Sequence, residues 1–261
     1  MRKEACVLAI AALVMLPAQT AAYAAHVTET AATTSLCRFD TASVAGGSYI
    51  VQNNEFNSSA SECVTTDGKA DFTVANSSIS NATNGSPGAY PSIYKGCHYG
   101  HCTANSGLPV QVAGMTTGKV RTSWHTTQTG AGAYDVAYDI WFNRTPATSK
   151  HPDGAEMMVW LARNGHVQPR GSKVATAKLD GLSFDVWRGG PTVSYVLTNS
   201  STSVNSLDID NITADAVSRG YVQKTWYLIG VEAGFELWQG GGKLTTDSFS
   251  VDVSTGATHN R

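Results

Sequence analysis

Three acidic segments of the sequence combine carboxylates with tryptophan, methionine or glycine at alternate positions. They are AYDVAYDIWFN (133–143), AEMMVWLARN (155–164) and YLIGVEAGFELWQ (227–239). In an extended strand, alternate side chains point to opposite faces. Each segment then has one apolar face and one face of acids beside indole rings or small residues. Because two carboxylates across a sugar-binding groove are the minimum equipment for cleaving a glycosidic bond, we predict this chemistry for the second face.

Alternation assigns the residues to the two faces. The acid-bearing rows are Asp135, Ala137, Asp139 and Trp141; Glu156, Met158 and Trp160; and Leu228, Gly230, Glu232, Gly234, Glu236 and Trp238. The apolar row of the third segment is expected to run through Tyr227, Ile229, Val231, Ala233, Phe235 and Leu237. A single acid on an outer face is often only solvated. Acids interleaved with indole rings and glycine are better explained by a cleft wall, because indole faces stack on sugars and carboxylates bind hydroxyl groups.

Similar alternating runs recur along the chain between Gly, Asn and Pro residues. They include SYIVQNN, KADFTVANS, KVRTSWHTTQT and SFSVDV. Many short strands at near-regular spacing are typical of a sandwich or jelly roll. We therefore predict an all-β fold, a β-jelly-roll sandwich of two antiparallel sheets. Residues 209–219 differ, because Ile212 and Ala216 recur at helical spacing, and they predict one short helix capped by Asp208 or Asn211.

The start of the chain differs in composition from the rest. Two basic residues precede an apolar stretch (5–16) and a small-residue tripeptide (22–24). This pattern is typical of a secretory signal peptide, and its apolar part is too short to span a bilayer as a helix. We predict a signal peptide over residues 1–24, a short flexible lead-in over 25–35 and a single catalytic domain over 36–261.

The mature chain predicted in this way is weakly acidic. The 261-residue sequence has a formal net charge of −2, and removal of the leader takes this to about −3. No basic stripe is available to hold a phosphate backbone, and no later apolar run reaches membrane length. We predict a secreted, extracellular monomer that binds neither nucleic acid nor membrane.

Four cysteines remain after the leader, an even number in an oxidising compartment. Three pairings are open, and we favour Cys37 with Cys63 and Cys97 with Cys102, because the second pair closes a short turn in KGCHYGHC. His98 and His101 could join Cys97 and Cys102 in a metal site. Oxidation would remove the thiolates that a metal needs, so we predict disulfides, no metal, and loop positions for both histidines.

Several motifs together resemble glycoside hydrolase family 12, the compact jelly-roll endoglucanases and xyloglucanases. YIVQNNEF is similar to the family's YxVxNNxW segment, and AYPSIYKGCHYGHCTANSGLPVQV to its Cys-bounded stretch. AYDVAYDIWFN resembles the acidic strand, AEMMVWLARNG the nucleophile motif E-x-M-[IV]-W, and GFELWQGGGKLTTDSFSVDV the general-acid motif with its C-terminal strand. The resemblance covers nearly all of the predicted mature chain, and the five motifs occur in the family's order.

The resemblance implies roles for three acids. Glu156 would be the nucleophile, Glu236 the general acid and base, and Asp139 the acid that hydrogen-bonds and orients the nucleophile. Family members retain anomeric configuration, since at about 5–5.5 Å separation the two glutamates leave no room for an intervening water. Glu232 is the rival to Glu236 on the same strand face, and the motif favours Glu236. Asp135 is interpreted as structural or surface.

The resemblance also implies substrate-binding positions and shows two departures. The expected cleft residues are Asn54, Phe56, Trp141, Met158, Trp160 and Trp238, although Trp160 could instead pack beneath a loop. Phe56 stands where the family has Trp, and Leu237 where many members have Pro. Phenylalanine still stacks on a sugar, but with less area. These departures leave the carboxylates intact and affect only the expected substrate preference.

The sequence therefore predicts a retaining endo-β-1,4-glucanase, without cofactor, that hydrolyses cellulose, mixed-linkage glucan or xyloglucan in a concave cleft. Two alternatives remain open at this stage. One is a non-catalytic carbohydrate-binding jelly roll, against which the acid pair argues. The other is an endo-β-1,4-xylanase of the related smaller jelly-roll family, against which the Cys-bounded stretch and the E-x-M-V-W motif argue.

Overall fold

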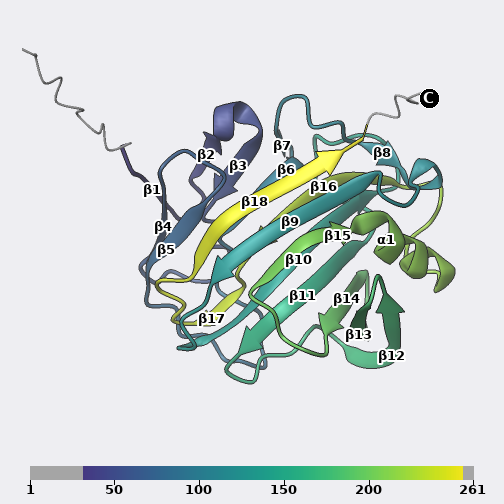
Figure 1. The fold of residues 1–261 in the computed structure, drawn as a ribbon. Coiled ribbons are helices and arrows are strands. Elements are labelled where there is room, and N and C mark those ends of the chain that lie inside the picture. The colour runs from purple at the N-terminus through teal and green to yellow at the C-terminus, as the bar shows by residue number, and fades with distance from the viewer. Residues whose placement is uncertain (1–31, 255–261) are drawn as a thin grey trace, which may run out of the picture. The chain divides into compact units, whose positions relative to one another are not determined.

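The computed structural model describes residues 32–254, which form two β-sheets, one α-helix and two 3-10 turns (Figure 1). The predicted signal peptide lies outside the described residues, as does most of the predicted lead-in. The first strand begins at Thr34, so the last two residues assigned to the flexible lead-in are already part of a sheet.

The smaller sheet has six strands. In spatial order these are β1 (Thr34–Cys37), β4 (Glu62–Thr66), β5 (Phe72–Ser77), β18 (Thr245–Val253), β9 (Val120–Thr127) and β15 (Ser203–Asp208). All its strand pairs are antiparallel. Alternate residues of β9 and β18 are buried, as expected for a sheet with one face on the core.

The larger sheet has twelve strands. Nine follow in the order β12 (Ser172–Leu179), β13 (Leu182–Gly189), β14 (Thr192–Leu197), β11 (Glu156–Asn164), β10 (Ala133–Asn143), β16 (Tyr227–Gly234), β6 (Ser92–His98), β3 (Tyr49–Gln52) and β2 (Thr41–Val44). The short strands β17 (Leu237–Gln239), β7 (His101–Cys102) and β8 (Val110–Gln111) pair with β10, β6 and β16. The predicted antiparallel pairing is wrong at one place, because β11 and β14 run parallel.

The core lies between the two sheets. Strands β18, β9 and β15 cross over β16, β10 and β11 in Figure 1. Trp124 of β9 lies edge-on to Tyr138 of β10, with ring centroids 5.1 Å apart, and it also approaches Phe235 at 5.9 Å. The apolar row of β10 predicted from alternation, from Tyr134 to Phe142, belongs entirely to this core.

The apolar row predicted for β16 breaks near its start. Leu228, and not Ile229, belongs to the core cluster. The reason is a change of register opposite β10, where Trp141 pairs with Gly230 but Phe142 pairs with Leu228. Such a bulge adds one residue to one strand and reverses the alternation beyond it. The acid-bearing part of β16, C-terminal to the bulge, keeps the predicted faces.

The predicted helix is confirmed as α1 (Ile209–Ser218). The side chain of Asp208 caps it by accepting hydrogen bonds from the backbone N–H groups of Asp210 and Asn211. Ile212 and Ala216 are buried, as their helical spacing predicted. Within residues 32–254, the structure contains no helix with the length and apolar character needed to cross a bilayer.

Both favoured disulfides are confirmed. Cys37 and Cys63 face each other as register partners on β1 and β4, and Cys97 and Cys102 do so on β6 and β7. The thiolates required by the alternative metal site are therefore not available. The expected loop positions of the histidines are wrong, because His98 is the buried last residue of β6 and His101 is the first residue of β7.

Candidate active site

Strand β10 is the element that brings the acids together. On one side Asp139 is the register partner of Met158 on β11, and on the other side it is the partner of Glu232 on β16. Trp141, two residues along, pairs with Glu156 on β11. Because residues two apart share a face, this register places Asp139, Glu156 and Glu232 on one surface of the sheet.

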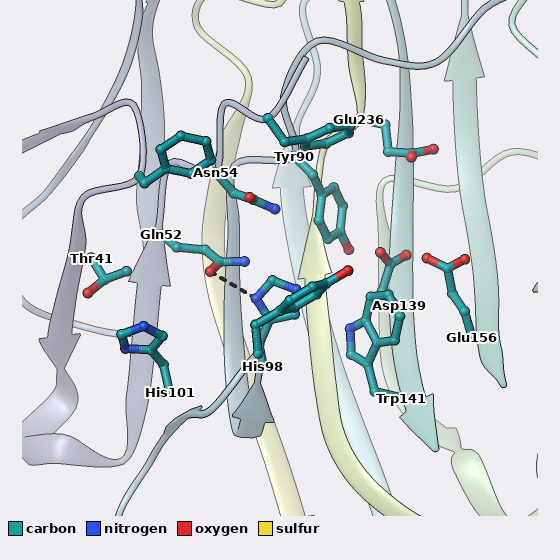
Figure 2. Close-up of a pocket in the computed structure, with 13 residues that line it drawn as sticks. Thr41, Gln52, Asn54, Tyr90, His98, His101, Asp139, Trp141, Glu156 and Glu236 are labelled. Atoms are coloured by element: carbon teal, nitrogen blue, oxygen red, sulfur yellow. Dashed lines mark hydrogen bonds between the residues drawn. The ribbon is translucent and has the colours of Figure 1, made fainter. Parts of the chain in front are cut away.

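This surface is hollowed by a cavity of about 460 Å³ that three carboxyl groups line, those of Asp139, Glu156 and Glu236. In Figure 2 the carboxyl groups of Asp139 and Glu156 lie side by side, and that of Glu236 lies on the same side of the cavity. The three groups affect one another electrostatically, since the charge of Glu156 raises the pKa of both other acids. The three acids to which the resemblance assigns catalytic roles therefore line one cavity.

Glu156 is the first residue of β11. Its Oε2 accepts a hydrogen bond from the hydroxyl of Thr192 at 2.7 Å, across the parallel pair with β14. Burial raises the pKa of Glu156, the Thr192 hydrogen bond lowers it, and the charge of Glu232 raises it again. Arg170 and His151 lower the pKa further, so two basic residues also lie near this carboxylate.

Asp139 and Glu236 hold their protons more firmly. The Asp139 side chain is buried, and its Oδ1 has no hydrogen-bond partner among the described residues. Burial, followed by the charges of Glu156 and Glu236, raises the pKa of Asp139 well above its ordinary value. Burial, followed by interaction with Asp135 and the charge of Glu156, does the same for Glu236. Both acids therefore hold their protons to higher pH than an ordinary carboxyl group does.

Glu232, the predicted rival of Glu236, does not line the cavity. It is fully buried, and its carboxylate accepts hydrogen bonds from Gln52, Ser92 and Trp141. A carboxylate whose oxygens are all occupied by protein donors has no free face for a sugar oxygen. The preference for Glu236 agrees with this arrangement.

The predicted substrate-binding residues divide into two groups. Asn54, Phe56 and Trp141 line the cavity. Met158, Trp160 and Trp238 do not, because they form a separate buried cluster with Ala133, Ala137 and Val167. Val167 belongs to the loop after β11, so Trp160 packs beneath a loop, which is the alternative that the sequence left open. The prediction of a cleft role is wrong for these three residues.

Sequence reasoning missed several residues that line the cavity. The aromatic ones are Phe39, Tyr90 and Tyr99, and the polar ones include Gln52, His98 and His101. Phe39 and Tyr99 are 64% and 46% exposed, which is unusual for large apolar rings and marks them as available for stacking. The only sequence feature that could have indicated Phe39 and Tyr99 is their position near cysteines. Phe39 lies two residues after Cys37, and Tyr99 lies inside the Cys97–Cys102 turn.

The turn between Cys97 and Cys102 contacts the loop between β10 and β11. The Tyr99 hydroxyl lies 3.0 Å from Nε2 of His151, which belongs to the β10–β11 loop, and the two rings pack edge to face. Gly100 has φ +89°, and a Cβ there would come within 3.1 Å of the carbonyl oxygen of Ser149. The turn can approach the loop this closely because glycine occupies the position.

Asp135 was interpreted as structural or surface, and the structure places it fully buried beside Glu236. It is not at the surface, and it belongs to the surroundings of the cavity acids. Alternation put Asp135 on the correct face, but the chain between β16 and β17 determines that Glu236 lies next to it. No sequence pattern reveals that approach.

A jelly roll with a surface cavity that is lined by three carboxyl groups and exposed aromatic rings defines the class of glycoside hydrolases. Comparison with known proteins agrees. The family model for glycosyl hydrolase family 12 matches residues 47–254. The endoglucanase Cel12A of Rhodothermus marinus has 42% identity and a TM-score of 0.81, with 85% of this chain and 99% of that chain covered. The chain belongs to glycosyl hydrolase family 12.

Other relatives carry names from both activities of the family. A family 12 xyloglucanase from Bacillus licheniformis has 27% identity and a TM-score of 0.76, covering 85% of this chain and all of that one. A probable cellulase of Mycobacterium tuberculosis is 33% identical over 47% of this chain and 83% of its own length. Endoglucanase S of Pectobacterium parmentieri is 32% identical over 63% and 66%.

Proposed function

We propose that this family 12 hydrolase is a secreted, monomeric, retaining endo-β-1,4-glucanase whose catalytic domain spans residues 36–261. The observation that carries the proposal is the convergence of Glu156, Glu236 and Asp139 on one cavity, with the pKa of Asp139 and Glu236 raised well above ordinary values. Two disulfides support residence in an oxidising compartment. The endoglucanase and xyloglucanase names of the relatives support a β-1,4-glucan backbone as substrate.

In the first step a carboxylate oxygen of Glu156 attacks the anomeric carbon of the sugar. The bond from this carbon to the leaving oxygen breaks, and the leaving oxygen takes its proton from Glu236. A covalent glycosyl-enzyme results. Glu236 suits this role because burial and neighbouring acids raise its pKa well above the ordinary value, while Glu156 is the acid with a hydroxyl donor to its carboxylate.

In the second step the negative charge of Glu156 is absent, since that side chain is esterified. The pKa of Glu236 therefore falls, and as a carboxylate it can take a proton from an incoming water. The water oxygen bonds to the anomeric carbon as the bond to Glu156 breaks. Two displacements at one carbon restore the original configuration, so the product is the retained anomer.

Asp139 orients the ionised Glu156 carboxylate before it attacks the sugar. A protonated Asp139 can donate a hydrogen bond to the Glu156 carboxylate beside it (Figure 2). Its buried Oδ1 has no partner among the described residues, which leaves it available for this bond. The donated hydrogen bond stabilises the ionised nucleophile and is weakened when the oxygen becomes an ester.

The sugar chain would lie against the aromatic rings that line the cavity. Phe39 and Phe56 are 64% and 48% exposed on the cavity wall beside β2 and β3, and Trp141 lies next to Glu156. Rings that stand open to solvent favour a groove in which a polymer can bind along its length, and this supports endo action. The smaller rings at positions 39 and 56 stack with less area than tryptophan would.

The test is the release of reducing ends by the mature protein from carboxymethylcellulose, mixed-linkage β-glucan, xyloglucan and xylan, with Glu156→Gln as the control. We expect activity on the glucan backbones that Glu156→Gln abolishes without loss of the fold. NMR of the first products should show the retained anomer. Binding without hydrolysis would favour the non-catalytic carbohydrate-binding alternative, and activity confined to xylan would favour the xylanase alternative.

A further inference from the structure

Glu232 is a buried acid that the proposed mechanism does not use. Its Oε1 accepts hydrogen bonds from Nε2 of Gln52 at 2.5 Å and from the Ser92 hydroxyl at 2.6 Å. Its Oε2 accepts one from the indole N–H of Trp141 at 3.0 Å. A buried carboxyl group with three donors directed at its two oxygens is arranged for the ionised form, since the ionised form only accepts hydrogen bonds.

The donors are themselves held in place. Nδ1 of His98 lies 3.2 Å from Oε1 of Gln52 (Figure 2). This contact leaves the amide nitrogen of Gln52 directed at Glu232. Nε2 of His98 lies 3.9 Å from Oε2 of Glu232, so a protonated His98 would add to the attraction. Side chains from β3, β6 and β10 thus converge on one carboxylate in β16.

Asp139 lies beside Glu232 but lacks a comparable set of hydrogen-bond donors. Asp139 and Glu232 are direct register partners on β10 and β16, and such partners have Cβ atoms about 4.5–5.5 Å apart. Both side chains are buried, but Oδ1 of Asp139 has no partner among the described residues. Two adjacent buried carboxyl groups cannot both ionise at low cost. The one with three donors keeps the charge, and the other keeps the proton.

We infer that Glu232 is a positioning residue whose fixed negative charge holds the proton on Asp139, so that Asp139 acts as a hydrogen-bond donor to Glu156. The catalytic consequence rests on the function proposed above. The protonation of Asp139 does not, because it follows from the burial of Asp139 and from the charges of the acids around it, Glu232 among them.

Other titratable groups also surround Asp139 and Glu232, and some of them affect the pKa of Asp139. Asp139 also faces Glu156, Glu236 and Tyr90, and Glu232 also faces Tyr94 of β6. Burial is the largest cause of the raised pKa of Asp139, followed by the charges of Glu156, Glu236 and Glu232. Glu232 differs from the first two because it takes no part in the proposed bond-forming and bond-breaking steps.

The test compares Glu232→Gln, which removes the charge, with Glu232→Asp, which keeps it on a shorter side chain. Carboxyl ¹³C NMR titration of the free protein would give the pKa values of Asp139 and Glu156. We expect Glu232→Gln to lower both values by about 0.5–1 unit, and Glu232→Asp to leave them within about 0.2 unit of the wild type. The pH profile of kcat/KM should move to lower pH only for Glu232→Gln.

Asp210→Asn serves as the matched control, because Asp210 is a buried acid in α1 whose carboxylate binds the backbone of Val120. If Glu232→Gln does not fold, Ser92→Ala removes one donor to Glu232 and should lower the pKa of Asp139 by a smaller amount. Unchanged pKa values, or equal shifts in the Gln and Asp variants, would overturn the inference. Failure of glucan hydrolysis would not affect the NMR result, so the two proposals are tested separately.

Discussion

The backbone N–H of Glu236 donates a hydrogen bond to Oδ1 of Asp135 over 3.1 Å, and the two side chains also interact. Asp135 is fully buried, and its other oxygen has no partner among the described residues. Burial raises the pKa of Asp135 to about 7, and the nearby Asp135 charge raises the pKa of Glu236. The position of Glu236 and the pKa of its carboxyl group therefore both depend on Asp135, which lies on the same face of β10 as Asp139.

Asp135→Asn should lower the pKa of Glu236, because it removes a negative charge beside a group that must lose a proton to ionise. The alkaline limb of the pH profile of kcat/KM should move to lower pH by about half a unit or more. Measurement of kcat/KM on a soluble glucan across the pH range would show the shift. A limb that stays in place would separate Asp135 from the titration of Glu236.

Glu236→Gln should reduce hydrolysis of polysaccharide by about 10²–10⁴-fold, since the leaving oxygen loses its proton donor. An aryl glycoside with an acidic phenol leaves without that proton, so its first step should be much less affected. The two substrates are compared by the burst of phenol and by reducing-end release. Equal losses on both would contradict the assignment of Glu236 as general acid.

Trp141 and Trp160 make a matched pair, because both lie on the acid-bearing face but only Trp141 lines the cavity. Trp141→Ala should weaken binding of cello-oligosaccharides, measured by calorimetry. Trp160→Ala should instead lower the free energy of unfolding by about 3–5 kcal/mol through loss of a buried indole. Weakened oligosaccharide binding in a fully folded Trp160→Ala protein would show that Trp160 contributes to substrate binding.

Glu62 predicts a pH dependence of stability that is separate from catalysis. Burial raises its pKa from 4.5 to about 8, although Asn53 donates a hydrogen bond to it. A folded state that binds the proton more tightly than the unfolded state loses stability as pH rises from about 4.5 to 8. Glu62→Gln should remove this loss, on the order of 3 kcal/mol between pH 5 and pH 8, in urea unfolding. The same pH dependence of the unfolding free energy in the wild type and in Glu62→Gln would argue against a raised pKa of Glu62.

The sequence predicted the elements with alternating residues best. The apolar rows of β10 and β11 and the capped helix follow directly from side-chain periodicity, which each segment contains by itself. The three acids that line the cavity are also the ones that the motifs singled out in the sequence. The parallel pairing of β11 with β14 was not, because periodicity says which face a residue occupies and nothing about the direction of the neighbouring strand.

The errors in the site have a common physical cause. Trp160, Trp238 and Met158 were assigned to the cleft because they share a face with Glu156 or Glu236, but loops cover part of that face. Conversely, Phe39 and Tyr99 reach the cavity from loops beside the disulfides, where no alternation exists to place them. A strand pattern predicts what a face carries, whereas the loops determine how much of it remains open.

The central place of β10 also has a consequence for how the molecule is made. Trp141 and Glu232 touch across 91 residues of chain, and Asp135 and Glu236 across 101. Closing loops of that length is entropically costly, and sheets built from such contacts form slowly. A ribosome-bound chain that ends before β16 holds Glu156 and Asp139 but neither Glu236 nor a partner for one edge of β10. Catalytic competence is therefore acquired only when the C-terminal strands have been synthesised and have paired.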